Sequence, residues 1–177
     1  MTRRYFVLLA SALMLAAASP RADESLRIVP LVDGKQVVVS LVLNDAYNDD
    51  VKDMIASGLR TTFTFDVELR AEVAGWVDRT VATTVVSITD QYDNLTRRHS
   101  LSRTIDGRMD ESLVTEDEQI VADWLTHVTR LPICPTSKLE RNREYYVRVS
   151  ARKRPQHSLP FAWASSLTGQ AKFTFVQ

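Results

Sequence analysis

The chain has 177 residues, of which 45% are hydrophobic and 25% are charged, a balance that excludes a collagen-like or largely disordered protein. Lysine and arginine together number 22, and aspartate and glutamate also number 22, so the formal net charge is zero. Because no excess of positive charge attracts phosphate backbones, we expect no nucleic-acid partner.

The N-terminus has the pattern of an export signal. Arg3 and Arg4 form a basic head, and residues 5–18 form an uncharged apolar run that ends in three alanines. A run of this length is too short to span a bilayer core, which takes roughly 20 helical residues. We therefore predict a signal peptide over residues 1–18, cleavage before Ser19, and no stable transmembrane anchor afterwards. The paired arginines leave both the general secretory route and the twin-arginine route open.

The mature chain begins with two predicted strands and a short helix. The strands cover residues 26–31 and 36–43, and Asp33-Gly34 between them accepts the positive φ angles of a tight hairpin turn. Residues 49–57 have apolar side chains on one helical face, and Gly58 is placed to end that helix. We expect an antiparallel hairpin followed by one short helix.

The clearest strand signal is the strict alternation of residues 62–73, where every second residue is apolar. This pattern is typical of a strand with one buried face and one solvated face. Further strands are predicted over residues 81–89, 95–105 and 109–114, with a tight turn at Asp106-Gly107.

A second helix is predicted after these strands, and two strands complete the chain. Thr115 to Glu118 has the arrangement of a capping box, and it precedes apolar residues at helical spacing up to Val128. The final strands cover residues 145–151 and 171–176. We therefore predict that residues 19–177 form a single, mainly β domain, an antiparallel meander or sandwich of about eight strands with two short helices; the alternative is an α+β fold.

The residues best suited to chemistry stand apart from one another in the sequence. No histidine has a second histidine or a cysteine at metal-ligand spacing, so we predict neither a metal nor a cofactor. We interpret His99 and His157 as solvated surface residues and His127 as a complement to the C-terminal dipole of the second helix. Cys134 is the only cysteine, which excludes an intramolecular disulfide, and we expect it to be a small buried hydrophobe.

Charge is distributed unevenly along the neutral chain. Residues 106–123 hold seven acidic side chains against one basic, whereas residues 138–154 hold seven basic against two acidic. One interpretation is that these charges occupy the solvated faces of strands and a helix. The other is a basic strand edge at Arg148, Arg152 and Arg154 that contacts an anionic membrane surface or an acidic partner.

A second candidate binding site lies in the run from Tyr92 to Arg97. In one interpretation Tyr92 and Leu95 pack at a strand junction while Asp93-Asn94 makes the turn. In the other, Tyr92, Thr96 and Arg97 bind a ligand.

Several short segments form a recognisable pattern when taken together. They are residues 57–69, Trp76 with Asp78-Arg79, and residues 92–98, 145–149 and 169–175. This pattern resembles a family of exported bacterial proteins known as domain of unknown function 4390. The resemblance implies a bacterial source and a periplasmic or other extracytoplasmic location. It brings no family activity, cofactor or catalytic residue with it.

The sequence contains no motif that indicates a specific reaction. It has neither a G-x-S-x-G nucleophile elbow nor a glycine-rich phosphate loop. We therefore interpret the protein as an exported, non-enzymatic binding or interaction domain. We expect its partner to be a protein or an envelope surface, for example the extracytoplasmic part of a membrane sensor. The alternative is a small periplasmic hydrolase whose site is assembled only by folding.

Overall fold

The computed structural model describes residues 25–73, 75, 77–155 and 166–176. The predicted signal peptide, Trp76 and His157 lie outside the described residues. Within the described ranges, no helix is both long enough and apolar enough to cross a bilayer.

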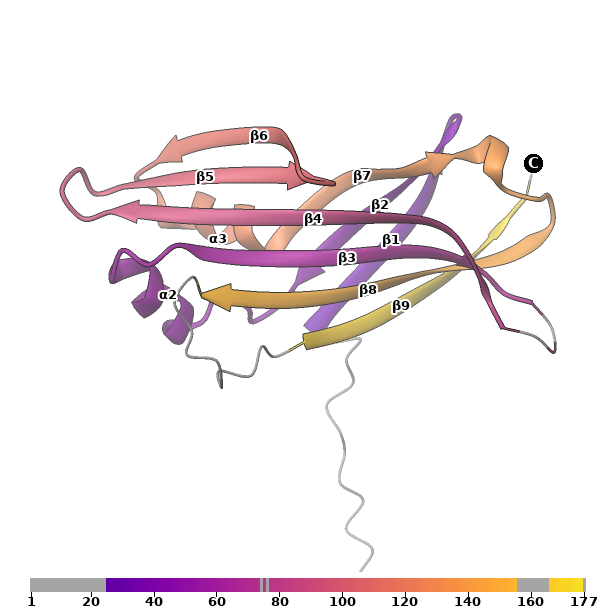
Figure 1. Cartoon of the computed structure of the whole chain (residues 1–177), viewed down its shortest axis with the longest axis horizontal. Coiled ribbons are helices and arrows are strands. Elements are labelled where there is room, and N and C mark those ends of the chain that lie inside the picture. Colours follow the sequence, from indigo (N-terminus) through magenta and orange to yellow (C-terminus); the bar gives the residue numbers. More distant parts are fainter. Residues whose placement is uncertain (1–24, 74, 76, 156–165, 177) are drawn as a thin grey trace, which may run out of the picture.

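The described residues form two antiparallel sheets and two α-helices (Figure 1). The elements in chain order are β1 (Leu26–Asp33), β2 (Gln36–Leu43), α2 (Asp49–Ala56), β3 (Thr61–Ala71), β4 (Arg79–Asp93), β5 (Arg98–Ile105), β6 (Arg108–Thr115), α3 (Glu118–Thr126), β7 (His127–Pro135), β8 (Arg143–Pro155) and β9 (Ser166–Phe175). The small sheet has the order β1-β2-β7, and the large sheet has the order β6-β5-β4-β3-β8-β9. The predicted mainly β, antiparallel fold with two short helices is therefore confirmed, with nine strands in place of about eight.

Strand β3 lies at the centre of the large sheet and has the predicted alternation. Its residues are alternately buried and half-buried from Thr61 to Ala71, and Phe65 has no exposed surface. The strand pairs with β4 on one side and with β8 on the other along its whole length. The apolar face of β3 therefore forms the floor of the hydrophobic core.

The small sheet covers this core from the opposite side, and α3 lies between the two sheets. Val37, Val39 and Leu41 of β2 are buried, as are Val121 and Leu125 of α3. All five belong to one hydrophobic cluster that also includes the inner face of the large sheet. The two sheets therefore share one core.

The two sheets approach each other closely where β1 packs against β9. A Cβ atom added to Gly169 on β9 would lie only 3.2 Å from Cδ1 of Ile28 on β1. A side chain at this position would crowd Ile28 and Leu26, so Gly169 helps the small sheet to close against that side of the large sheet.

The predicted turns and first helix are confirmed at their residues. Gly34 has a φ angle of 58° in the turn between β1 and β2. Asn48 caps α2 by accepting a hydrogen bond from the Val51 amide, and Gly58 follows the helix with a φ angle of 77°. Asp106 and Gly107 both have positive φ angles in the turn between β5 and β6, as a two-residue hairpin turn favours.

The predicted capping box is wrong, because β6 continues through Thr115. The Thr115 hydroxyl accepts a hydrogen bond from the Asp117 amide, only two residues on. Asp117 is the N-cap, and its carboxylate accepts a hydrogen bond of 2.8 Å from the Gln119 amide. The helix begins at Glu118, so the N-cap position falls on Asp117, and Thr115 lies two residues too early in the chain to fill it.

Strand β7 has no counterpart in the prediction, because it follows α3 without a turn. His127 is both the C-cap of the helix and the first residue of the strand. Pro132 and Pro135 obscure the strand pattern, and β7 tolerates them because it is an edge strand. Cys134 on this strand is buried as predicted, and burial raises the pKa of its thiol.

The central position of β3 leads to a stability prediction. Phe65→Ala should lower the free energy of unfolding by about 3–5 kcal/mol, because it removes a buried ring and leaves a cavity. Thr64→Ala, on the opposite face, should cost far less. Urea denaturation of the two variants measures both values. Equal losses of unfolding free energy in the two variants would contradict the assignment of Phe65 to the buried face of β3 and of Thr64 to the opposite face.

Candidate functional site

The turn between β4 and β5 holds the predicted site residues Tyr92 and Arg97. The Asp93 carboxylate accepts hydrogen bonds from the amides of Leu95 and Thr96, at 2.8 and 3.4 Å. These hydrogen bonds lower the pKa of Asp93, and they make the predicted turn. The expected packing of Leu95 is wrong, because its side chain is 94% exposed.

A pocket of about 380 Å³ opens beside this turn, and we name it the hairpin pocket. It is formed by α2 and the loop before it, by the hairpin of β4 and β5, and by the connection from β6 to α3. The polar and aromatic side chains that line it are Tyr47, Lys52, Asp53, Tyr92, Arg97, His99, Glu116 and Glu118. The structure therefore brings Tyr92 and Arg97 together in one recess.

His99, which lines the hairpin pocket, is paired with a second buried ionisable group, Asp90. Asp90 is fully buried, His99 is 6% exposed, and their Oδ2 and Nδ1 atoms are 2.8 Å apart. Burial raises the pKa of Asp90, although its hydrogen bond to His99 acts in the opposite direction. The other carboxylate oxygen of Asp90 is buried and has no hydrogen-bond partner among the described residues.

The expectation that His99 is a solvated surface residue is therefore wrong. His99 lies on the same face of β5 as the buried Leu101, whereas its neighbour Arg98 is exposed. The basic neighbour suggested a surface position, but the alternation of the strand decides which way each residue faces. The alternation of residues along β5 is the sequence pattern from which the burial of His99 could have been predicted.

Tyr92 holds the imidazole of His99 in place from the neighbouring strand. The two residues are directly opposite in the register of β4 and β5, and their ring centroids are 4.6 Å apart. With Nδ1 bonded to Asp90, the Nε2 atom of His99 has no partner within the described part of the chain. Since an ionised carboxylate only accepts hydrogen bonds, Nδ1 of His99 is the donor when Asp90 is ionised, and Nε2 is the ring nitrogen left available to a ligand.

The opposite wall of the pocket carries a tyrosine and a lysine. The Lys52 ammonium lies 5.7 Å from the ring centroid of Tyr47 and 3.6 Å from the Asp49 carboxylate. Burial raises the pKa of the Tyr47 hydroxyl, and the nearby negative charges of Glu118 and Asp90 add to this effect. The Tyr47 hydroxyl therefore stays a neutral donor and acceptor at the pocket.

The rim of the pocket carries charges of both signs. Glu116 is paired with Arg98 at 2.9 Å, whereas Glu118 and Arg97 form no ion pair among the described residues. A recess with free groups of both signs, two phenol rings and an imidazole is suited to a polar ligand that both donates and accepts hydrogen bonds.

The predicted basic edge at Arg148, Arg152 and Arg154 is wrong as an edge, because β8 lies between β3 and β9. Arg148 is exposed on the outer face of the sheet, and Arg152 forms an ion pair with Asp66 of the neighbouring strand. Arg154 belongs to β8, and its side chain lies outside the described part of the structure. The order of the strands decides this point, and it has no signal in the local sequence.

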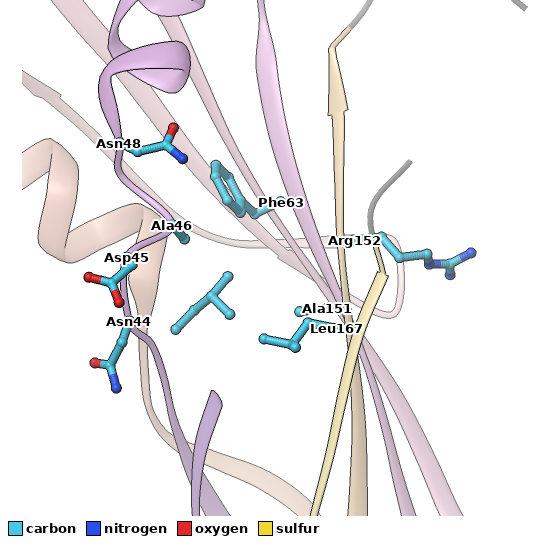
Figure 2. A pocket seen from close by; sticks show the side chains of 9 residues that line it. Asn44, Asp45, Ala46, Asn48, Phe63, Ala151, Arg152 and Leu167 are labelled. Atoms are coloured by element: carbon cyan, nitrogen blue, oxygen red, sulfur yellow. The ribbon is translucent and has the colours of Figure 1, made fainter. Parts of the chain in front are cut away.

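A second, smaller pocket of about 200 Å³ lies at the same end of the protein (Figure 2). Phe63, Ala151 and Leu167 give it apolar walls, and Asn44 and Asn48 lie on its polar side. Figure 2 shows the guanidinium of Arg152 pointing away from this cavity. Among its described lining residues there is no pair of buried ionisable groups, so the hairpin pocket is the stronger candidate site. In the described ranges, no group of three or more potential ligands gathers to hold a metal ion.

The comparison with protein families matches residues 24–168 to the family described as Domain of unknown function (DUF4390). The chain belongs to this family. No curated protein and no solved structure matches the chain. The residues that match DUF4390 include every residue of the hairpin pocket.

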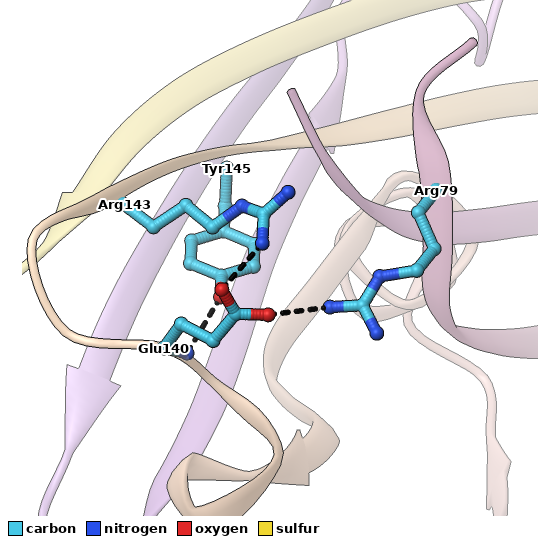
Figure 3. Close-up of polar contacts among 4 residues, drawn as sticks. All are labelled: Arg79, Glu140, Arg143 and Tyr145. Carbon is cyan, nitrogen blue, oxygen red and sulfur yellow. Dashed lines mark hydrogen bonds and ion pairs between the residues drawn. The ribbon is translucent and has the colours of Figure 1, made fainter. Parts of the chain in front are cut away.

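Other residues of the DUF4390 pattern close the far end of the large sheet (Figure 3). The Glu140 carboxylate binds both Arg79 and Arg143, and the Tyr145 hydroxyl accepts a hydrogen bond of 2.7 Å from the Glu140 amide. Beside them, the Tyr146 hydroxyl donates to the Asp78 carboxylate. These contacts are structural, because they tie the connection between β7 and β8 to the beginnings of β4 and β8.

The buried pair gives this DUF4390 protein a predictable pH dependence. The pKa of Asp90 in the folded state is above its ordinary value of 3.8, so the folded state binds the proton more tightly than the unfolded state. Stability from this group is fully present below pH 3.8 and is lost as pH rises through the raised pKa. The free energy of unfolding of the natural protein, relative to Asp90→Asn, should therefore fall as pH increases.

Asp93→Asn is the matched control. Because the pKa of Asp93 is lowered in the folded state, this group should contribute a pH dependence of stability of the opposite sign. Relative to that variant, the natural protein should lose stability as pH falls. Urea denaturation between about pH 3 and pH 7 gives all the values. If the free energy of unfolding of the natural protein, relative to that of Asp90→Asn, rises with pH, the raised pKa of Asp90 is contradicted.

Proposed function

We propose that this DUF4390 protein is an exported binding domain that takes a polar group of a ligand or of a partner protein into the hairpin pocket. The observation that carries the proposal is the hydrogen bond between His99, which lines the pocket, and the fully buried Asp90. Burying a carboxylate with one unpartnered oxygen costs free energy, and an apolar residue would fill the same position in a sandwich core without that cost. A binding role explains why the pair lies where the core opens to a pocket.

The pocket offers a specific set of contacts to such a group. His99 presents a free Nε2 atom, and the phenol rings of Tyr47 and Tyr92 provide flat apolar walls. Arg97 and Glu118 supply one charge of each sign at the rim. The volume of about 380 Å³ lies at the small end of the range for ligand pockets, which suits a small polar molecule or one side chain of a partner.

Export belongs to the same proposal and is supported by the N-terminal sequence. The basic head and the apolar run of residues 5–18 are typical of a cleaved signal peptide. We propose the periplasm or another extracytoplasmic compartment as the location. The partner is then a protein of the envelope or its surface, such as the extracytoplasmic part of a membrane sensor. Arg148, Arg152 and Arg154 remain proposed contacts of such a partner, as residues of the interior strand β8.

One observation favours a second candidate, a small periplasmic hydrolase. A histidine whose Nδ1 is bonded to a buried carboxylate is the arrangement of a general base. The described residues that line the hairpin pocket include no serine and no cysteine, so such a base would have to activate a water molecule. Binding requires no such additional group, and it is the function that we favour.

Photocrosslinking in the native envelope tests the proposed binding function. A photoreactive phenylalanine derivative placed at Lys52, whose side chain is 48% exposed at the pocket, should give a discrete crosslinked product. The same group at Val29, which is 45% exposed on the small sheet, should not give this product. Identical products at both positions, or none at Lys52, would contradict a binding role for the pocket.

The variants His99→Gln and Arg97→Glu then separate binding from hydrolysis. Both should reduce the Lys52 product, and their melting temperatures show whether each variant is folded. Turnover of ester, amide or phosphodiester substrates that is lost in His99→Gln and kept in Arg97→Glu would replace the binding function with the hydrolase.

A further inference from the structure

We infer that β6 is a docking edge, to which a basic, extended segment of a partner protein adds as a further strand of the large sheet. The inference rests on the proposed function, because the segment belongs to the protein partner proposed above. It names the surface that such a partner uses and the chemistry that the surface selects.

Strand β6 is the outermost strand of the large sheet and pairs only with β5. Seven of its eight residues are exposed, and the eighth is half-buried. Along its outer side, no backbone group of β6 is hydrogen-bonded to another described strand. A row of free amide and carbonyl groups is a template for backbone pairing with an added strand.

The other three edge strands are protected in ways that β6 is not. In the small sheet, β1 contains Pro30, and β7 contains Pro132 and Pro135. Proline lacks the amide that a pairing strand would use. At the far edge of the large sheet, β9 packs against β1 at Gly169. Among the described edge strands, β6 alone has neither a proline nor a covering strand.

The regular part of β6 is long enough to receive a strand. Its single irregularity in pairing with β5 lies between Arg103 and Thr104, and the residues from Glu111 to Thr115 pair without interruption. Leu113 is opposite the buried Leu101 and faces inward, whereas Val114 faces outward, and both are more than a third exposed. An added strand would therefore find an apolar neighbour on each face.

The charge of this edge selects the partner. The segment from Asp110 to Glu118 carries five acidic side chains and no basic one. Arg103 and Arg98 of β5 are paired with Glu111 and Glu116, and the other three acidic residues form no ion pair among the described residues. This excess of negative charge attracts a basic segment. It also repels the β6 edge of a second copy, which disfavours self-pairing.

The edge leads directly to the hairpin pocket. Glu116 and Glu118 follow the last residue of β6, and both line that pocket. A segment paired along β6 therefore ends beside Glu116 and Glu118, at the side of the pocket, and its next side chain can reach the pocket from there. The two surfaces form one continuous contact for an extended chain.

Short synthetic peptides test the docking edge on the purified protein. The probe is a fluorescent peptide that alternates lysine and valine, and the comparison peptides replace lysine with glutamate or place proline at the centre. The lysine peptide should bind, as measured by fluorescence anisotropy, and should protect the amides of residues 111–115 from hydrogen exchange. The glutamate and proline peptides should do neither, and added salt should weaken the lysine complex.

The double variant Asp110→Lys, Glu111→Lys should weaken the lysine peptide by about tenfold or more. The matched control is Glu68→Lys, Glu144→Lys, which makes the same change of charge on β3 and β8 and should leave the affinity unchanged. All four side chains lie on the surface or partly exposed, so the melting temperatures should stay close to that of the natural protein. Equal weakening by both double variants would overturn the inference, because it would show only a general effect of charge.

Two further outcomes also overturn it. One is protection of residues 111–115 without peptide in a protein that dimerises, which would assign the edge to a second copy. The other is binding of the lysine peptide with protection elsewhere in the chain. The Lys52 crosslink keeps the two proposals separate. If the peptide does not bind but the crosslinked product still forms, only the docking edge is contradicted. If the peptide binds but no crosslinked product forms, only the function of the pocket is contradicted.

Discussion

Burial of one face of β3 constrains the rest of the large sheet. A shift of one residue against either neighbour would turn Phe63 and Phe65 toward solvent, so both registers are strongly specified. That register sets the inner face of β4, where Asp90 continues the row of Val86 and Ile88. The candidate site therefore depends on the same packing that stabilises the core, because the position of the acidic group follows from the alternation of the central strands.

The two ends of the sandwich differ in how they are closed. At one end, Glu140 and Asp78 accept hydrogen bonds from side chains of β4 and β8 and tie the loops to the sheet. At the other end, α2, the hairpin of β4 and β5 and the start of α3 surround a recess instead. The polar ties at the first end are satisfied within the chain, whereas His99 and Asp90 keep unpartnered atoms within the described residues. This contrast separates residues that hold the fold from residues that a ligand would complete.

The order of the strands decides which of the charged segments lies at a free edge of the large sheet. Strand β8 is an interior strand of the large sheet, and its Arg152 is paired with Asp66 of β3. The acidic segment after Arg108 forms the free edge and continues into the rim of the hairpin pocket. A neutral chain thus presents an acidic edge beside its recess, and long-range attraction would guide a basic segment to that side of the molecule.

Local patterns in the sequence were sufficient for β3, for the turns at Gly34 and Asp106-Gly107, and for α2, because alternation, positive φ angles and helix caps depend on neighbouring residues. The same patterns brought Tyr92 and Arg97 to notice as candidate site residues. They did not reveal β7, the burial of His99 or the interior position of β8. Those features depend on contacts between segments far apart in the chain: β7 exists because β2 pairs with it, and β8 is covered because β9 returns beside it. The pairing of Asp90 with His99 is likewise a product of cross-strand register, which only the folded sheet decides.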